Sequence, residues 1–172
     1  MPLIDLDSIL TTPRIGEILV VGPEGAAIST YVETVCPQVE KSGSELVWGN
    51  IRASSDLMLF LYGLNINSPY RNFAWDLVAD KLLGIVILFD WYHEESSHEI
   101  EKLLSFILQK STAPIVCAAD TRNRPIPYRE SVYRPPIAVS RRCKFTFCQS
   151  TRAVSIRRTV ISLVDMLLNE LG

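Results

Sequence analysis

The sequence lacks the features that mark several classes of protein. No apolar stretch reaches the roughly 18 residues that a membrane-spanning helix requires, and Met1–Asp7 has neither the basic nor the apolar region of a secretory signal peptide. The four cysteines lack CxxC and CxxH spacing, and the separation of His93 and His98 fits no zinc site. We therefore expect a cytoplasmic protein with buried free thiols, no membrane span and no zinc.

The composition is that of one folded domain with an uneven charge. At 172 residues, 48% hydrophobic and 21% charged, the chain is long enough to bury a core. We expect one domain over residues 1–172, with residues 1–14 as an N-terminal extension. Residues 1–120 carry 7 Lys and Arg against 16 Asp and Glu, whereas residues 121–158 carry 10 against 1.

The basic stretch Arg122–Arg158 has several interpretations. It predicts either a solvated face or a surface for an acidic protein partner, with anionic lipid and nucleic acid as weaker alternatives. Nucleic-acid binding is not favoured, because Tyr128 and Tyr133 are the nearby aromatic side chains that would have to stack on bases. The basic residues are Arg122, Arg124, Arg129, Arg134, Arg141, Arg142, Lys144, Arg152, Arg157 and Arg158.

Short β-branched runs alternate with helix-length amphipathic stretches, which predicts a mostly parallel sheet with helices on both faces. Six strands are expected, at 17–21, 45–53, 56–62, 83–89, 114–119 and 144–148. Ser54 and Ser55 join the second strand to the third, so these two should form an antiparallel hairpin. Helices are expected at 29–35, 70–81, 97–109 and 151–171, and loops at 63–69 and 122–136.

Residues 22–30 are arranged like a phosphate-binding loop. They follow the apolar run 17–21 and have the sequence GPEGAAIST. In such a loop, backbone N–H groups and a helix N-terminus hold phosphate oxygens, a Lys neutralises the β- and γ-phosphates, and a Ser or Thr binds Mg²⁺. Here Ile28 stands where the lysine belongs. Ser29 is a candidate metal ligand, or else a hydroxyl in the first turn of a helix.

The order of elements and several local segments resemble the bacterial MglA-type Ras-like GTPases. The similar segments are EILVVGPEGAAIST, LVWGNI, DLMLFLYGLN, FAWDLVADKLLGIVILFD, APIVCAAD and FTFCQST, so the resemblance extends from about Ile15 to Leu171. It implies an α/β Ras-like P-loop fold. The sheet would be six-stranded and mostly parallel, with one antiparallel strand and helices on both faces.

The resemblance also shows how the nucleotide-binding motifs have changed. The family ends its P-loop with Gly-Lys-Thr/Ser, which matches Ala27, Ile28 and Ser29, and loss of the lysine removes a charge-assisted contact worth about 2 to 3 kcal/mol. The γ-phosphate sensor, a threonine in the family, falls among Ser42–Glu45, where only serines are offered. The switch glycine corresponds to Gly63, but no Gln follows it to orient an attacking water.

The base-binding motif is altered as well. The family's Asn-x-x-Asp corresponds to Asp120–Asn123, with the two residue types exchanged, and an Asn amide cannot accept both guanine protons. Ser150 lies in the last base-contacting loop. The degenerate nucleotide-binding residues implied by the resemblance are Gly22, Gly25, Ala26, Ala27, Ile28, Ser29, Thr30, Gly63, Asp120, Asn123 and Ser150.

Three altered elements lead us to interpret the chain as a pseudo-GTPase with no catalytic residue and no cofactor. The alternatives are a slow GTPase switch that binds GTP or GDP with Mg²⁺, and an unrelated α/β protein such as a receiver-like domain. The resemblance implies a roadblock/LC7-domain partner, expected to be a homodimer, in a polarity, motility or signalling complex. The expected partner-binding residues, apolar and beside a polar rim, are Leu64, Ile66, Pro69 and Tyr70.

Overall fold

The computed structural model describes residues 13–23, 26–65, 79–93, 96–125 and 141–170. Two expectations therefore lie wholly or mostly outside the described residues, namely the helix at 70–81 and the proline-rich loop at 122–136. The same holds for residues 1–12 of the expected N-terminal extension. Within that extension, Arg14 already belongs to the first strand.

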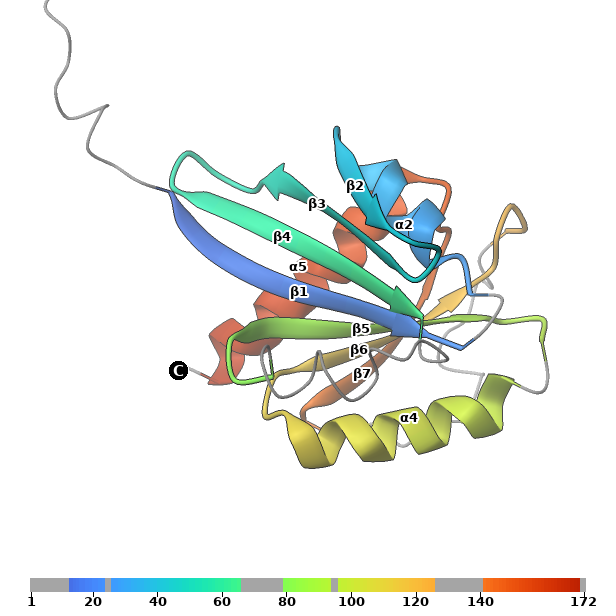
Figure 1. Cartoon of the computed structure of the whole chain (residues 1–172). Coiled ribbons are helices and arrows are strands. Elements are labelled where there is room, and N and C mark those ends of the chain that lie inside the picture. The colour runs from blue at the N-terminus through green and yellow to red at the C-terminus, as the bar shows by residue number, and fades with distance from the viewer. Residues whose placement is uncertain (1–12, 24–25, 66–78, 94–95, 126–140, 171–172) are drawn as a thin grey trace, which may run out of the picture.

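Seven strands form one sheet with the order β2-β3-β4-β1-β5-β6-β7 (Figure 1). The strands are β1 Arg14–Gly22, β2 Val39–Ser42, β3 Leu46–Arg52, β4 Leu57–Asn65, β5 Leu82–Asp90, β6 Ile115–Asp120 and β7 Cys143–Cys148. The helices are α2 Ile28–Val35, α4 Ser96–Lys110 and α5 Ala153–Glu170. Strand β3 runs antiparallel to both of its neighbours, and the other neighbouring pairs are parallel.

The prediction of six strands is wrong by one, because β2 was missed. This strand has the sequence VEKS, and three of its four side chains are exposed. Its backbone pairs with β3 at the edge of the sheet, and Lys41 forms an ion pair with Glu33 of α2. A short, polar edge strand has no buried face to produce apolar alternation, so its sequence resembles that of a loop. The predicted single antiparallel strand and the hairpin between β3 and β4 are confirmed.

Helices cover both faces of the sheet, with α2 and α5 on one face and α4 on the other (Figure 1). Successive side chains of β5 point to opposite faces of the sheet, so this one strand contributes to two cores. Ile85 and Ile87 pack with α4, whereas Val86 and Leu88 pack with α2 and α5, and all four are fully buried. The continuous apolar run of β5 is therefore that of a central parallel strand, as predicted.

A buried hydroxyl pair fixes α2 against α5. Tyr31 is fully buried, and its phenol donates a hydrogen bond to Thr159 Oγ1 at 2.5 Å. The Thr159 hydroxyl donates in turn to the carbonyl of Ile156. Burial raises the pKa of Tyr31 well above its usual value, because the site excludes the water that would solvate a phenolate. The helix that follows the P-loop is thus tied to the C-terminal helix independently of any ligand.

The predictions about cysteines and membrane spans can be compared with the structure. Cys36, Cys117, Cys143 and Cys148 are buried and free, as predicted. Among the helices that the structure describes, none has the length and apolar character needed to cross a membrane.

Candidate functional site

The candidate site lies where β1 turns into α2. Gly22 ends β1, and a Cβ atom at this position would lie 2.1 Å from the carbonyl oxygen of Leu88. Only glycine allows β1 and β5 to approach so closely at this point. Helix α2 then begins at Ile28, with Ala27 as an N-cap residue whose side chain makes no capping hydrogen bond. Gly25, a predicted phosphate-binding residue, lies outside the described residues.

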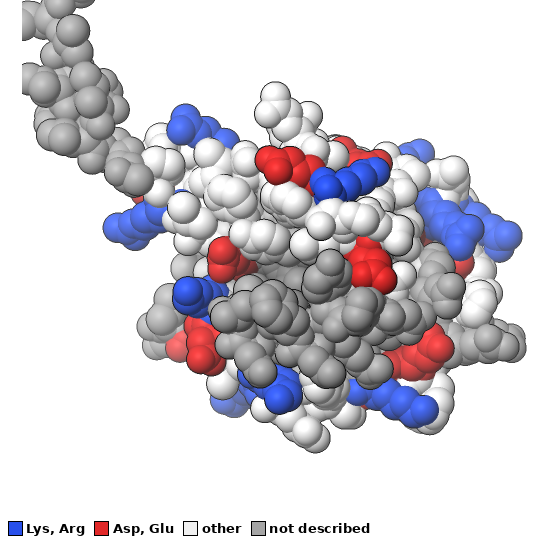
Figure 2. Space-filling view, viewed as in Figure 1, with Lys and Arg blue, Asp and Glu red and all other residues white. Residues whose placement is uncertain are grey.

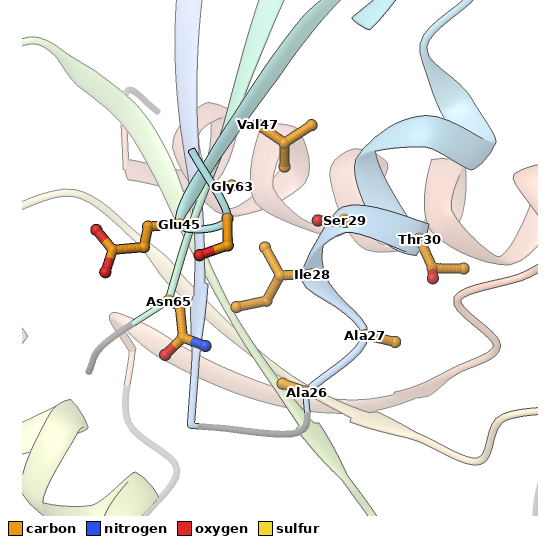
Figure 3. A pocket seen from close by; sticks show the side chains of 10 residues that line it. Ala26, Ala27, Ile28, Ser29, Thr30, Glu45, Val47, Gly63 and Asn65 are labelled. Atoms are coloured by element: carbon orange, nitrogen blue, oxygen red, sulfur yellow. The ribbon is translucent and has the colours of Figure 1, made fainter. Parts of the chain in front are cut away.

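Ile28 packs as a core residue. It is only 6% exposed and belongs to the core cluster shared with α5. A methyl group on Gly63 would lie 2.7 Å from Ile28 Cγ2 and 2.7 Å from Val47 Cγ1, so the isoleucine occupies the space beside this glycine. Figure 3 shows the Ile28 side chain directed toward Gly63 and Asn65. The position of the phosphate lysine therefore contributes packing and no charge.

Two amides of the loop are already bonded within it. The N–H of Ala26 donates to the carbonyl of Pro23 at 3.1 Å, and the N–H of Ile28 donates to the carbonyl of Ala26 at 2.9 Å. A phosphate-binding loop works by directing successive N–H groups at the anion. These two N–H groups are directed to the loop's own carbonyls, which weakens the anion cradle.

A pocket of about 210 Å³ remains between the start of α2 and the ends of β3 and β4 (Figure 3). Among the residues that line it, Glu45 carries the one charged side chain, and its charge is negative. Figure 3 shows the Glu45 carboxylate directed away from Ile28, so the lining residues that the structure describes supply no cation for a phosphate. Ser29 and Thr30 are also among the lining residues, and the role of Ser29 as a metal ligand stays a prediction. The lining residues are Ala26, Ala27, Ile28, Ser29, Thr30, Ser44, Glu45, Val47, Gly63 and Asn65.

The segment that corresponds to the first switch forms a hairpin turn. Gly43 has a φ of +63° between β2 and β3, a left-handed conformation that favours glycine. Of the two candidate sensor serines, Ser44 lines the pocket, whereas Ser42 ends β2. Antiparallel pairing on both sides of the turn fixes its position. No group of three or more His, Cys, Asp or Glu side chains suited to a metal occurs within the described part of the chain.

The segment that corresponds to the second switch was predicted as a loop from Gly63, and this is wrong for its first three residues. Strand β4 continues to Asn65, so Gly63 pairs with Val20 of β1 and with Val47 of β3. Leu64 is only 3% exposed and cannot serve as the predicted apolar anchor, because its side chain belongs to the core cluster on the α4 side of the sheet.

The remaining predicted partner-binding residues, Ile66, Pro69 and Tyr70, lie outside the described residues. Their expected role in binding a partner stays a prediction.

The predicted base-binding residues come together at the carboxyl ends of β6 and β7. Asp120 is only 2% exposed, and its Oδ1 accepts hydrogen bonds from the N–H groups of Arg122 and Ser150. Its Oδ2 accepts the hydroxyl of Ser150 at 2.6 Å. Burial and the negative charge of Asp120 raise the pKa of the neighbouring Cys148 thiol above its usual range. Asp120 thus joins the loop after β6 to the loop after β7.

Asn123 stands where the family places the guanine-binding carboxylate. Its side chain is exposed, and its Oδ1 accepts a hydrogen bond from the Thr151 hydroxyl at 3.0 Å. This oxygen therefore already accepts one hydrogen bond within the protein. In addition, Gln149 and Thr121 both donate side-chain hydrogen bonds to the carbonyl of Arg124. These contacts close the two loops on each other.

Sequence reasoning missed two cross-links at this end of the sheet. Arg122, at a left-handed φ of 55°, forms an ion pair with Asp90 at 2.6 Å. The guanidinium of Arg124 lies 4.1 Å from the ring centroid of Tyr92, within cation–π range. The sequence feature that could have indicated these contacts is that Asp90 and Asp120 end adjacent strands. The loops after β5 and β6 therefore lie at the same edge of the sheet.

The basic stretch does not form one surface among the described residues. Arg122, Arg124 and Arg152 follow the carboxyl ends of β6 and β7, whereas Arg141 and Arg142 precede the start of β7 at the opposite edge. Arg157 and Arg158 are exposed on α5. Figure 2 shows basic and acidic side chains interspersed around the described part of one face. An acidic protein partner for this stretch stays a prediction.

Comparison with known proteins gives one informative result. No family model matches the sequence, and no curated protein matches it. Among solved structures, the chain is similar to a chain of the T. brucei IFT22/74/81 GTP-bound crystal structure, with a TM-score of 0.65 and 14% identity. The match covers 92% of this chain and 98% of that chain. The predicted Ras-like α/β fold is confirmed.

The confirmed fold also excludes one alternative. A receiver-like domain has a five-stranded parallel sheet with the order 2-1-3-4-5, whereas this sheet has seven strands and an antiparallel β3. An identity of 14% shows the fold alone. Nucleotide binding and the choice of partner therefore have to be argued from this chain's own residues.

Proposed function

We propose that the protein is a Ras-like pseudo-GTPase, a non-catalytic subunit that binds protein partners and needs no nucleotide cofactor. The observation that carries this proposal is the burial of Ile28 against Gly63 beside a pocket whose charged lining residue is Glu45. A triphosphate placed there would meet an aliphatic side chain where it requires a cation.

The closed base loops support the same proposal. Ser150 donates hydrogen bonds to Asp120, and Thr151 donates one to Asn123. A guanine base would find no carboxylate at Asn123 to accept both of its protons. The phosphate and base positions thus argue independently for the loss of nucleotide binding.

Calorimetric titration with GTP or GDP in the presence of Mg²⁺ tests the proposal. We expect no binding below millimolar concentrations. A thermal scan provides a second measurement: a ligand at about 1,000 times its Kd stabilises a protein by about 4 kcal/mol, which for a chain of this size raises Tm by roughly 8 to 16 °C. At 1 mM nucleotide we expect a shift below about 1 °C. Sub-micromolar binding would refute the proposal.

A slow GTP-binding switch is the second candidate. The open pocket of about 210 Å³, with the Ser29 hydroxyl at the start of α2, favours it. This candidate requires Mg²⁺-dependent binding of GTP that the change Ser29→Ala weakens. It also requires measurable phosphate release under single-turnover conditions.

For the partner, we propose a homodimeric roadblock/LC7-domain protein in a polarity, motility or signalling complex. Two points support it: the resemblance to MglA-type proteins, and a structural neighbour that belongs to a multi-protein IFT22/74/81 assembly. Mixing the purified proteins and measuring mass by light scattering tests this proposal. If the protein binds no nucleotide, the conformation of its partner-binding surface does not depend on GTP or GDP. We therefore expect the same complex with GTP, with GDP and with neither. A complex that forms only with GTP would support the switch instead.

A further inference from the structure

Helix α5 presents an apolar stripe to solvent. Val154, Ile161 and Leu168 are 63%, 56% and 61% exposed, and they are three of the five large hydrophobic side chains that are exposed within the described chain. They are spaced by seven residues, so they lie on one face of the helix about two turns apart. Single exposed apolar residues are common, but a heptad row of them indicates a helix that packs against another helix.

The same face carries complementary charges. Arg157 and Asp165 are exposed and lie four residues before and four residues after Ile161. Arg158 is also exposed on this face. The central apolar residue is thus flanked by a cation toward the N-terminus and an anion toward the C-terminus.

We propose that α5 pairs with α5 of a second copy of this chain, antiparallel and with the two-fold axis at Ile161. In this register Ile161 meets its own counterpart, and Val154 lies opposite Leu168 of the other copy. Arg157 lies opposite Asp165 of the other copy, and the two-fold axis repeats the contact. A parallel register would place Arg157 beside Arg157 and Asp165 beside Asp165, so the charges favour the antiparallel arrangement.

The surface beside the stripe extends the contact area beyond one helix. A pocket of about 430 Å³ lies between α5 and the β3–β4 hairpin, lined by Ile51, Arg52, Ala53, Leu59, Arg157, Val160 and Ile161. Ile161 belongs to both the stripe and the pocket, and Arg157, which flanks the stripe, also lines the pocket. In the antiparallel pair, the side chains on α5 of the second copy lie next to this pocket, so the pocket and the stripe form one continuous surface.

Sedimentation velocity over a range of concentrations tests the dimer, and a charge swap tests its register. Each of Arg157→Asp and Asp165→Arg turns both ion pairs into repulsive pairs, so each should weaken dimerisation roughly tenfold. The double variant R157D/D165R restores opposite charges and should recover the wild-type dimerisation. Ile161→Lys should give a monomer at all concentrations. Ile15→Lys, which changes a residue 64% exposed on β1, is the matched control and should leave the dimer intact.

Cysteine cross-linking tests the position of the two-fold axis. The four native cysteines are buried, so Ile161→Cys supplies an accessible thiol that faces its own counterpart. With an added mild oxidant, two thiols lose two electrons and two protons and form an intermolecular disulfide. We expect dimeric I161C on a non-reducing gel and monomeric I15C under the same conditions. A monomeric wild type, or a swap variant that fails to recover while circular dichroism shows it folded, would overturn the proposal. Both outcomes are independent of nucleotide.

Discussion

Removing the packing between Ile28 and Gly63 tests whether the phosphate-lysine position has become part of the core. Ile28→Ala deletes Cγ2 and the rest of the buried side chain, and such changes cost about 2 to 5 kcal/mol of the free energy of unfolding. Gly63→Ala adds a methyl group 2.7 Å from Ile28 Cγ2. Overpacking of this kind costs about 1 to 3 kcal/mol.

The two changes should not be additive. In the I28A background the atom that the new methyl group would meet is gone, although Val47 Cγ1 still lies 2.7 Å away. We therefore expect the double variant to be more stable than the sum of the single changes predicts, by about 0.5 to 3 kcal/mol. Ile28→Val is the matched control, because valine keeps a Cγ2 atom. Combined with G63A, it should be additive within about 0.5 kcal/mol.

Urea unfolding of the six proteins, followed by circular dichroism with a shared slope, measures this cycle. A cost of Ile28→Ala below about 1 kcal/mol would refute the assignment of Ile28 to the core. If G63A shows the same non-additivity in the free energy of unfolding with I28A as with I28V, the contact with Ile28 Cγ2 is not the cause of the non-additivity. Either result would show that the contact between Ile28 and Gly63 contributes little to the stability of the core.

Two further predictions concern buried groups. Thr159→Val leaves the Tyr31 phenol buried without its acceptor and should cost about 1 to 3 kcal/mol. Tyr31→Phe leaves the Thr159 hydroxyl bonded to Ile156 and should cost about 1 kcal/mol; equal costs in urea unfolding would contradict this asymmetry. For pH, burial raises the pKa of the Cys36 thiol from 9.0 to about 11. The unfolded chain then loses the proton first, so stability should fall as pH rises from 9 to 11. Cys36→Ala should flatten this fall in denaturant midpoints measured across the range.

The elements that the sequence predicted best are those buried on both faces. The apolar runs of β5 and β6 identify central strands, because a parallel strand covered by helices has no polar side. The prediction failed for β2, whose exposed Glu40, Lys41 and Ser42 carry no apolar pattern. Its existence depends on backbone pairing with β3, which no local pattern of side chains reveals.

The site was predictable where strand ends bring residues together and unpredictable where loops make specific contacts. Asp120, Asn123 and Ser150 were expected at one edge of the sheet, and they lie there. The exchange of Asp120 and Asn123 in the base motif was also visible in the sequence, but its consequence was not. That Asp120 would join two loops depends on the turns after β6 and β7, which bring the N–H groups of Arg122 and Ser150 to one carboxylate oxygen.

Isoleucine at position 28, where the resemblance implies a phosphate-binding lysine, affects where the fold obtains its stability. A protein that binds a ligand tightly gains stability from it, by about 4 kcal/mol at 1,000 times Kd. A chain without a ligand has to obtain that stability from its own packing. Fully burying an isoleucine contributes about 1.5 to 3 kcal/mol, and Gly63, having no side chain, leaves the space in which Ile28 is buried. Under the proposed function, the substitution that removes the phosphate's cation thus also offsets much of the stability that the phosphate would have supplied.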